Sequence, residues 1–201
     1  SGFGIVGGAR QLTIKRSTLN INPAQGDLVT TPDSGIGYMA GVSYERPDIA
    51  LKVLLTQSPG IDIVVPTTVV GSGTVSQPSF TTLEFETGIA NNTLLFGSMH
   101  QGEHASAQVK LNGIGAISSF TDGEKYNIGV GRKFNDSLSA SLSYTTEEGS
   151  SATGTSLLSP TNGTDTYALG INYSTESVDI AFGYAMSSFG DKAVTTAYGT
   201  G

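Results

Sequence analysis

The chain has 201 residues with 10 Lys and Arg against 17 Asp and Glu, and this net charge of −7 argues against a nucleic-acid partner, which would need a basic face. The sequence contains no Cys, which excludes disulfides, thiolate nucleophiles and Cys-zinc sites. No apolar run approaches the roughly 20 residues of a membrane-spanning helix, so a helical membrane protein is excluded as well.

Alternation of apolar residues with small or polar ones predicts a series of β-strands. Turn residues such as Pro, Asn, Asp and Ser interrupt the alternation at short, regular intervals. We expect nine strands, and a tenth at 178–188, over approximately residues 2–15, 35–45, 50–63, 78–88, 93–102, 106–118, 123–133, 137–147 and 165–173.

The alternation is clearest between Tyr126 and Met186. Near the end of this stretch, two strands joined by a tight hairpin place large apolar residues on one face, namely Tyr167, Leu169, Ile171 and Tyr173, then Val178, Ile180, Phe182, Tyr184 and Met186. The residues between them are small or polar. Because successive side chains of a strand point to opposite faces, one face of the predicted sheet is apolar and the other is small or polar.

The predicted connections differ at the two ends of the strands. At one end they are brief, at 45–48, 88–92, 133–136 and 174–177, and each contains residues that favour turns. At the other end they are long and polar, at about 16–34, 64–77 and 148–164. Short turns at one rim and long loops at the other are typical of outer-membrane barrels.

The composition indicates which solvent meets each face. Charged residues make up only 13% of the chain, compared with about a quarter in ordinary soluble domains, and 27 residues are Gly. A soluble β-sandwich normally carries charged residues on its outer face, whereas here that face is mostly small. We therefore predict an all-β fold, an antiparallel up-and-down transmembrane β-barrel with lipid outside and a narrow polar lumen, formed by residues 1–201 as a single domain.

Nine or ten strands in an open sheet would leave two unpaired edges in hydrocarbon, which is energetically prohibitive. The chain also ends in a loop-like segment at 193–201 that contains no closing strand. We therefore expect this domain to be an incomplete part of a longer chain, closed by that chain's remaining strands or by a partner chain.

Charged residues on the predicted inner face are the candidate substrate-binding residues. Counting along the strands places Arg10, Glu45, Lys52, Glu84 and Glu86 opposite the large apolar side chains. A Lys or Arg on the lipid face near the midplane would cost about 2–4 kcal/mol, so these charges are expected in the lumen. They either line a substrate passage, where Arg10 or Lys52 could pair with a carboxylate headgroup, or neutralise one another inside a filled barrel.

No catalytic or metal site is expected. His100 and His104 would lie on one face of a strand but about 13 Å apart, too far for joint coordination, so we expect them to be rim residues. Ser is abundant, but no Gly-x-Ser-x-Gly elbow is present. We therefore expect neither an enzyme nor a cofactor.

Three segments resemble the FadL/TodX family of outer-membrane transporters for long-chain fatty acids and hydrocarbons. These are residues 37–53, 79–98 and 126–136, and their order and spacing agree with the carboxy-terminal half of such proteins. The chain departs from the family in having Met99, His100 and Gln101 where relatives carry an Arg-Trp pair, and in having no Trp at all.

The resemblance implies a fourteen-stranded barrel in the outer membrane of a Gram-negative bacterium, plugged by an amino-terminal hatch that this chain does not contain. It implies transport of hydrophobic small molecules without covalent chemistry, with membrane lipid and the apolar substrate as partners. Two other functions remain open from the sequence: a structural or adhesive surface β-protein whose faces pack against another sheet, and a non-specific porin.

Overall fold

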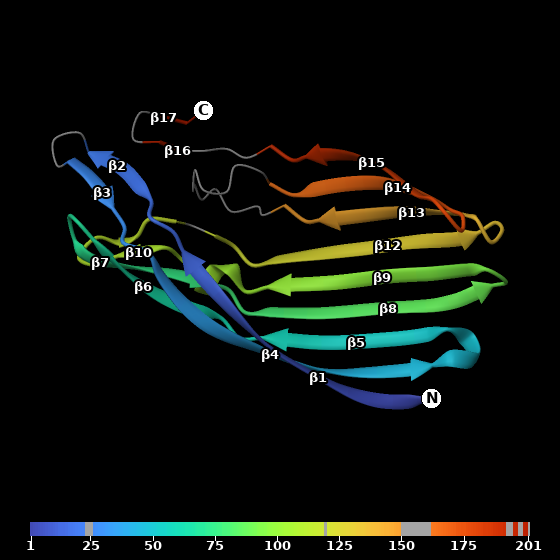
Figure 1. Cartoon of the computed structure of the whole chain (residues 1–201). Coiled ribbons are helices and arrows are strands. Elements are labelled where there is room, and N and C mark those ends of the chain that lie inside the picture. The colour runs from blue at the N-terminus through green and yellow to red at the C-terminus, as the bar shows by residue number, and fades with distance from the viewer. Residues whose placement is uncertain (23–25, 119, 150–161, 192–194, 197–198, 201) are drawn as a thin grey trace.

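The fold of the chain is known from a computed structural model, which describes residues 1–22, 26–118, 120–149, 162–191, 195–196 and 199–200. Nine long strands form one antiparallel sheet (Figure 1). In sheet order they are β1 (Gly2–Ile14), β4 (Asp33–Arg46), β5 (Leu51–Ser58), β8 (Phe80–Ala90), β9 (Thr93–Gly102), β12 (Gly123–Lys133), β13 (Leu138–Glu147), β14 (Thr164–Ser174) and β15 (Asp179–Phe189). Since each long strand pairs with the long strand before it in the chain, the predicted all-β, up-and-down architecture is confirmed.

One predicted strand is wrong. Residues 106–118 do not join the sheet, but form the short helix η2 (His104–Ser106) and the two-residue strands β10 (Lys110–Leu111) and β11 (Gly115–Ala116). Gly113 and Gly115 adopt φ values of 74° and 96°, which reverse the chain in a conformation that glycine favours. The side chain of Gln108 also accepts hydrogen bonds from Ser118 and from the Phe120 backbone, which holds the segment as a compact loop.

The predicted strand at 50–63 is too long, and the predicted loop at 64–77 contains regular structure. β5 ends at Ser58, and the chain then forms a hairpin of β6 (Ile61–Thr67) and β7 (Gly71–Gln77). These strands join β10 and β11 in a second, four-stranded sheet in the order β11-β10-β7-β6. The alternation continues from β5 into β6 through Ile61, Ile63 and Val65, so the sequence pattern alone did not show where the sheet changes.

The other long connections also contain short strands. β2 (Thr18–Asn22) and β3 (Gly26–Val29) form a hairpin within the predicted loop 16–34, and β16 (Thr195–Thr196) pairs with β17 (Gly199–Thr200) in the predicted tail. Most of the predicted loop 148–164 lies outside the described residues. Among the residues that the structure describes, no helix is long and apolar enough to cross a membrane.

The four brief connections lie together at one end of the sheet, on the right in Figure 1. In the first, η1 (Pro47–Ile49) is followed by Ala50 in a left-handed conformation. Arg46 donates hydrogen bonds to Asp48 in this turn and so lowers the pKa of that carboxyl. In the third, the side chain of Asn135 accepts hydrogen bonds from the next backbone N–H groups, as turn residues commonly do.

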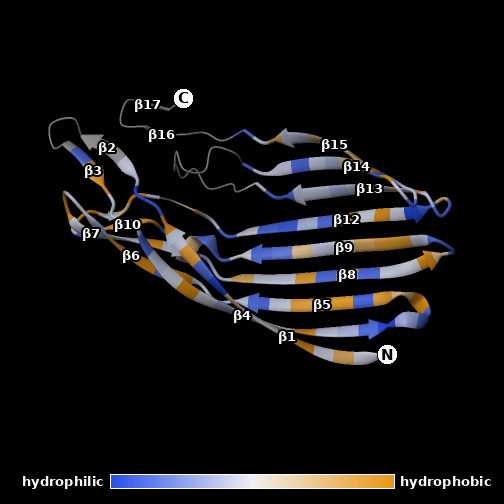
Figure 2. Cartoon of the chain, viewed as in Figure 1, coloured by the Kyte–Doolittle hydropathy of each residue, from blue (hydrophilic) through white to orange (hydrophobic). Residues whose placement is uncertain are grey.

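Bands of hydrophobic and hydrophilic residues follow one another along the long strands (Figure 2), and because successive side chains point to opposite faces, the two faces of the nine-stranded sheet differ in chemistry. The apolar face carries many large side chains that are exposed, including Phe3, Ile5, Val42, Leu55, Leu83, Ile128, Leu142, Leu169, Phe182 and Tyr184. Phe3 and Ile5 are 88% and 92% exposed. The polar face carries the five charged residues predicted for the lumen together with many Gly, Ser and Ala residues.

The buried apolar residues lie outside the nine-stranded sheet. Within the described part of the chain they are Leu28, Ile61, Ile63, Val65, Ala107 and Leu111, which belong to the β2–β3 hairpin, the four-stranded sheet and the loop beside it. A β-sandwich would bury the apolar face against a second layer, but none of the described strands covers it. The apolar face therefore needs a medium other than the described protein or water.

Candidate functional site

The polar face carries a row of charges that crosses three strands. The register aligns Glu45 of β4 with Lys52 of β5, and Lys52 with Glu86 of β8. Lys52 Nζ lies 2.9 Å from Glu86 Oε1, so these two side chains form an ion pair. Side chains directly opposite each other on neighbouring strands are close enough to interact, which explains why residues distant in sequence meet here.

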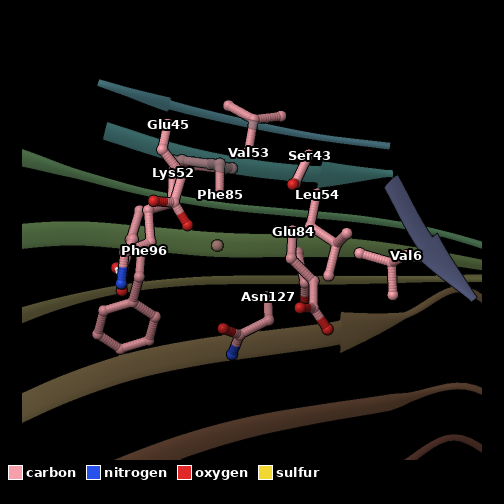
Figure 3. A pocket seen from close by; sticks show the side chains of 13 residues that line it. Val6, Ser43, Glu45, Lys52, Val53, Leu54, Glu84, Phe85, Phe96 and Asn127 are labelled. Carbon is pink, nitrogen blue, oxygen red and sulfur yellow. Dashed lines mark ion pairs between the residues drawn. The ribbon is translucent and has the colours of Figure 1, made fainter. Parts of the chain in front are cut away.

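These charges line a hollow of about 590 Å³ on the polar face. Figure 3 shows its lining residues, which come from β1, β4, β5, β8, β9 and β12. Glu84 lies two residues from Glu86 on the same face of β8, and Ser98 and Asn127 follow it on the next two strands. Val6, Leu54 and Phe96 supply apolar surface. The hollow thus combines apolar walls with a few polar groups, the usual character of a small-molecule site.

The balance of charge in this hollow is negative. Glu45, Glu84 and Glu86 contribute three carboxylates against the single ammonium of Lys52, which is already paired with Glu86. Within the described part of the chain, Glu45 and Glu84 make neither a hydrogen bond nor an ion pair, and both side chains are exposed to the hollow. Since the pair of Lys52 and Glu86 is also largely exposed, it adds little stability and leaves a net acidic surface.

Arg10 lies apart from the other four predicted residues. It pairs in register with Gly37, whereas Glu45 pairs with Gly2, eight residues or roughly 26 Å away along β1. The guanidinium lies over the ring of Phe80, with its carbon 5.9 Å from the ring centre. The five residues therefore share one face but form two separate groups.

The surroundings of Arg10 include residues that the sequence analysis did not select. The ring of Phe80 stacks on His100 at 4.8 Å and meets His104 edge-on at 5.8 Å, while Thr82 hydrogen-bonds His100. The even-numbered positions of β8 that place Glu84 and Glu86 on the polar face also place Phe80 and Thr82 there, so alternation could have found them.

The two histidines do not lie on one strand as expected. β9 ends at Gly102, and His104 belongs to η2, so the chain turns and brings both rings against Phe80. The predicted spacing along a strand is therefore wrong for this pair. In the part of the chain that the structure describes, no three His, Asp or Glu side chains are grouped as metal ligands would be.

Aromatic residues mark both margins of the apolar face. Phe3 and Tyr44 pack together at 4.9 Å near the short turns, and Tyr144 and Tyr167 do so nearer the long connections. On β14, Tyr167 and Tyr173 are six residues or about 20 Å apart along the strand, with Leu169 and Ile171 between them. An apolar band between two aromatic rows is the surface pattern of a barrel wall in lipid.

The arrangement of strands matches solved membrane barrels. Superposed on a Pseudomonas aeruginosa FadL homologue, the chain gives a TM-score of 0.65 at 12% identity over 96% of its own length and 57% of that protein's. The chain has the FadL-type barrel fold. Two monoaromatic hydrocarbon channels share the FadL-type fold with it at a TM-score of 0.55: CymD, at 13% identity over 87% of this chain and 51% of that one, and a TodX deltaS2S3 mutant, at 12% identity over 92% and 60%.

The chain spans between half and three fifths of the length of these three proteins. A scan against protein-family models finds no match, and neither does a search of curated proteins. At 12% to 13% identity the likeness establishes the fold.

Proposed function

We propose that this chain forms part of an outer-membrane channel in a Gram-negative bacterium, and that the channel passes hydrophobic small molecules without covalent chemistry. The observation that carries the proposal is the exposed apolar face opposite a polar face that contains hollows. The FadL-type fold supports it, because the solved structures that share this fold include two hydrocarbon channels.

The proposal includes a closed barrel. β1 and β15 each have one partner strand among the described residues, and an open strand edge in hydrocarbon would leave backbone groups without hydrogen bonds. We infer that further strands of a longer chain, or of a partner chain, complete the wall. In that barrel Arg10, Glu45, Lys52, Glu84 and Glu86 would face the lumen and contact or orient the passing molecule.

Uptake into liposomes tests the proposal directly. The native protein, reconstituted in phospholipid vesicles, is expected to admit a long-chain fatty acid or a monoaromatic hydrocarbon faster than protein-free vesicles do. Small sugars are expected to pass no faster than through empty vesicles. Equal entry of sugars and apolar molecules would establish a non-specific porin instead, and no entry of either would refute the channel.

The acidic hollow gives a second test, by the reversal potential of the channel in a salt gradient. Removing the Glu84 carboxylate with Glu84→Gln is expected to weaken the preference for cations relative to the native protein, because lumenal carboxylates attract cations. Lys52→Gln is expected to strengthen that preference. Glu176→Gln, in a brief turn at the rim, is the control and should change nothing. Identical potentials in all four proteins would show that the hollow does not line the pore.

A further inference from the structure

The β6–β7 hairpin is an extension of the wall hairpin formed by β5 and β8. Ser58 pairs with Phe80 at the end of the wall, and Ile61 pairs with Gln77 at the start of the extension. Between these two pairs, Pro59-Gly60 in one strand faces Pro78-Ser79 in the other. Proline cannot donate a ladder hydrogen bond, so both strands are interrupted at the same level. The break has the form of a hinge.

Beyond this hinge, the hairpin folds over the polar face of β1 and β4 (Figure 1). Ile61, Ile63 and Val65 pack together and against Leu12 and Ile14 of β1. Two glycines of β4, Gly35 and Gly37, leave the space that the Ile61 side chain occupies. A Cβ on Gly35 would lie 2.7 Å from Ile61 Cγ2, and one on Gly37 only 2.4 Å from Ile61 Cδ1. The absence of these two side chains is therefore what allows the hairpin to close.

The closed hairpin also leaves polar atoms without partners. Among the described residues, the buried side-chain atoms that lack a hydrogen bond are Arg10 Nε, Arg10 Nη2, Thr67 Oγ1 and Gln77 Oε1. Thr67 and Gln77 are in the hairpin, and Arg10 lies beneath Ile61, since the Cβ position of Gly37 is also only 3.4 Å from Arg10 Nε. Unsatisfied buried groups oppose closure, while the small apolar cluster favours it.

We propose that hairpin β6–β7 is a lid that pivots at Pro59-Gly60 and Pro78-Ser79, and that its opening exposes Nε and Nη2 of Arg10 to water and to a ligand carrying a hydrogen-bond acceptor. An acceptor of this kind, such as the carboxylate or hydroxyl of an amphiphile, supplies the partner that Arg10 lacks when the lid closes. The lid goes beyond the proposed channel function, because its opening can be measured on the protein in detergent without any transport.

Hydrogen exchange of the backbone amides, read segment by segment in detergent micelles, tests the lid. Amides of 61–77 are expected to exchange at least tenfold faster than those of the wall strands β5 and β8. Gly37→Ala is expected to raise the lid's exchange rate at least tenfold further, because the new methyl group displaces Ile61. Gly131→Ala, on the same face but with no neighbouring atom nearer than 4.0 Å, is the control and should leave the lid unchanged.

The role of Arg10 in lid opening is tested by removing the N–H donors of its guanidinium. Arg10→Met and, independently, Thr67→Val each abolish unpaired polar atoms and are expected to slow exchange of the lid several-fold. Decanoate is expected to slow exchange of the lid amides in the native protein but not in Arg10→Met. Decane, which has no hydrogen-bond acceptor, is expected to slow exchange in neither protein. If the amides of 61–77 exchanged as slowly as those of β5 and β8 in both the native protein and Gly37→Ala, the hairpin would not be a lid. An equal effect of decanoate in native protein and Arg10→Met would overturn the role of Arg10.

Discussion

Replacing Leu142 by Arg is expected to lower the free energy of unfolding in phospholipid vesicles by about 2–4 kcal/mol, the cost of a cation on the lipid face of a barrel. Leu142 is central in β13, 56% exposed, and lies between Val130 and Leu169 of the neighbouring strands. Because the Leu142 side chain has few protein contacts to lose, the lower free energy of unfolding would reflect the cost of placing a cation in the surrounding hydrocarbon. Guanidinium titration of vesicle-bound protein measures it.

The control for Leu142→Arg is the adjacent residue on the other face. Ser141 pairs with Gly131 and Gly170, so an Arg there would project into the lumen beside small residues. Ser141→Arg should therefore change stability much less. Surface substitutions in water usually remain within about 0.5 kcal/mol. If Leu142→Arg were equally mild, the apolar face would not contact lipid, and the membrane assignment would be lost.

Replacing Gly41 by Ala is expected to cost about 1–3 kcal/mol, the usual penalty for overpacking. A Cβ at this position would lie 2.4 Å from the backbone oxygen of Leu55 and 2.7 Å from Thr56 Cγ2. Since a backbone oxygen in a paired strand cannot rotate away, β4 and β5 would have to move apart. Guanidinium titration of the vesicle-bound variant should show this decrease in the free energy of unfolding.

Gly131→Ala is the matched substitution for Gly41→Ala. Both glycines lie on the polar face of central strands, but Gly131 has no neighbouring atom nearer than 4.0 Å. Because glycine weakens a strand interior by about 0.5–1 kcal/mol relative to alanine, Gly131→Ala should be neutral or slightly stabilising. Equal losses in the two variants would show that the close approach of β4 to β5 does not limit side-chain size.

The wall strands could be predicted because each has only one apolar face. The alternation from Tyr167 to Met186 gave the β14–β15 hairpin with nearly correct ends. The same pattern misled at Ile61 and Ile63, which alternate like wall residues but bury their side chains in the lid. Periodicity reports that one face is apolar and does not distinguish contact with lipid from contact with protein, so the bend at Pro59-Gly60 was missed.

For the candidate site, alternation placed all five charged residues on one face but gave no distances between strands. The pairing of Lys52 with Glu86, and the separation of Arg10 from both, depend on the register of β1, β4, β5 and β8. That register is fixed by turn lengths and by packing between paired strands, in which partners such as Gly2 and Glu45 are up to 43 residues apart in sequence. Phe80 shares the even-numbered positions of β8 with Glu84 and Glu86 and so lies on the polar face, but its contacts with Arg10 and His100 depend on the same register.

The direction of the outermost strands restricts how the wall can be completed. Both β1 and β15 start at the rim of brief turns and run toward the opposite rim, because nine is an odd number. Joining them directly, or adding a second copy in the same membrane orientation, would create a parallel seam. Only an odd number of additional strands gives a ring that is antiparallel throughout, and five would bring the total to an even fourteen.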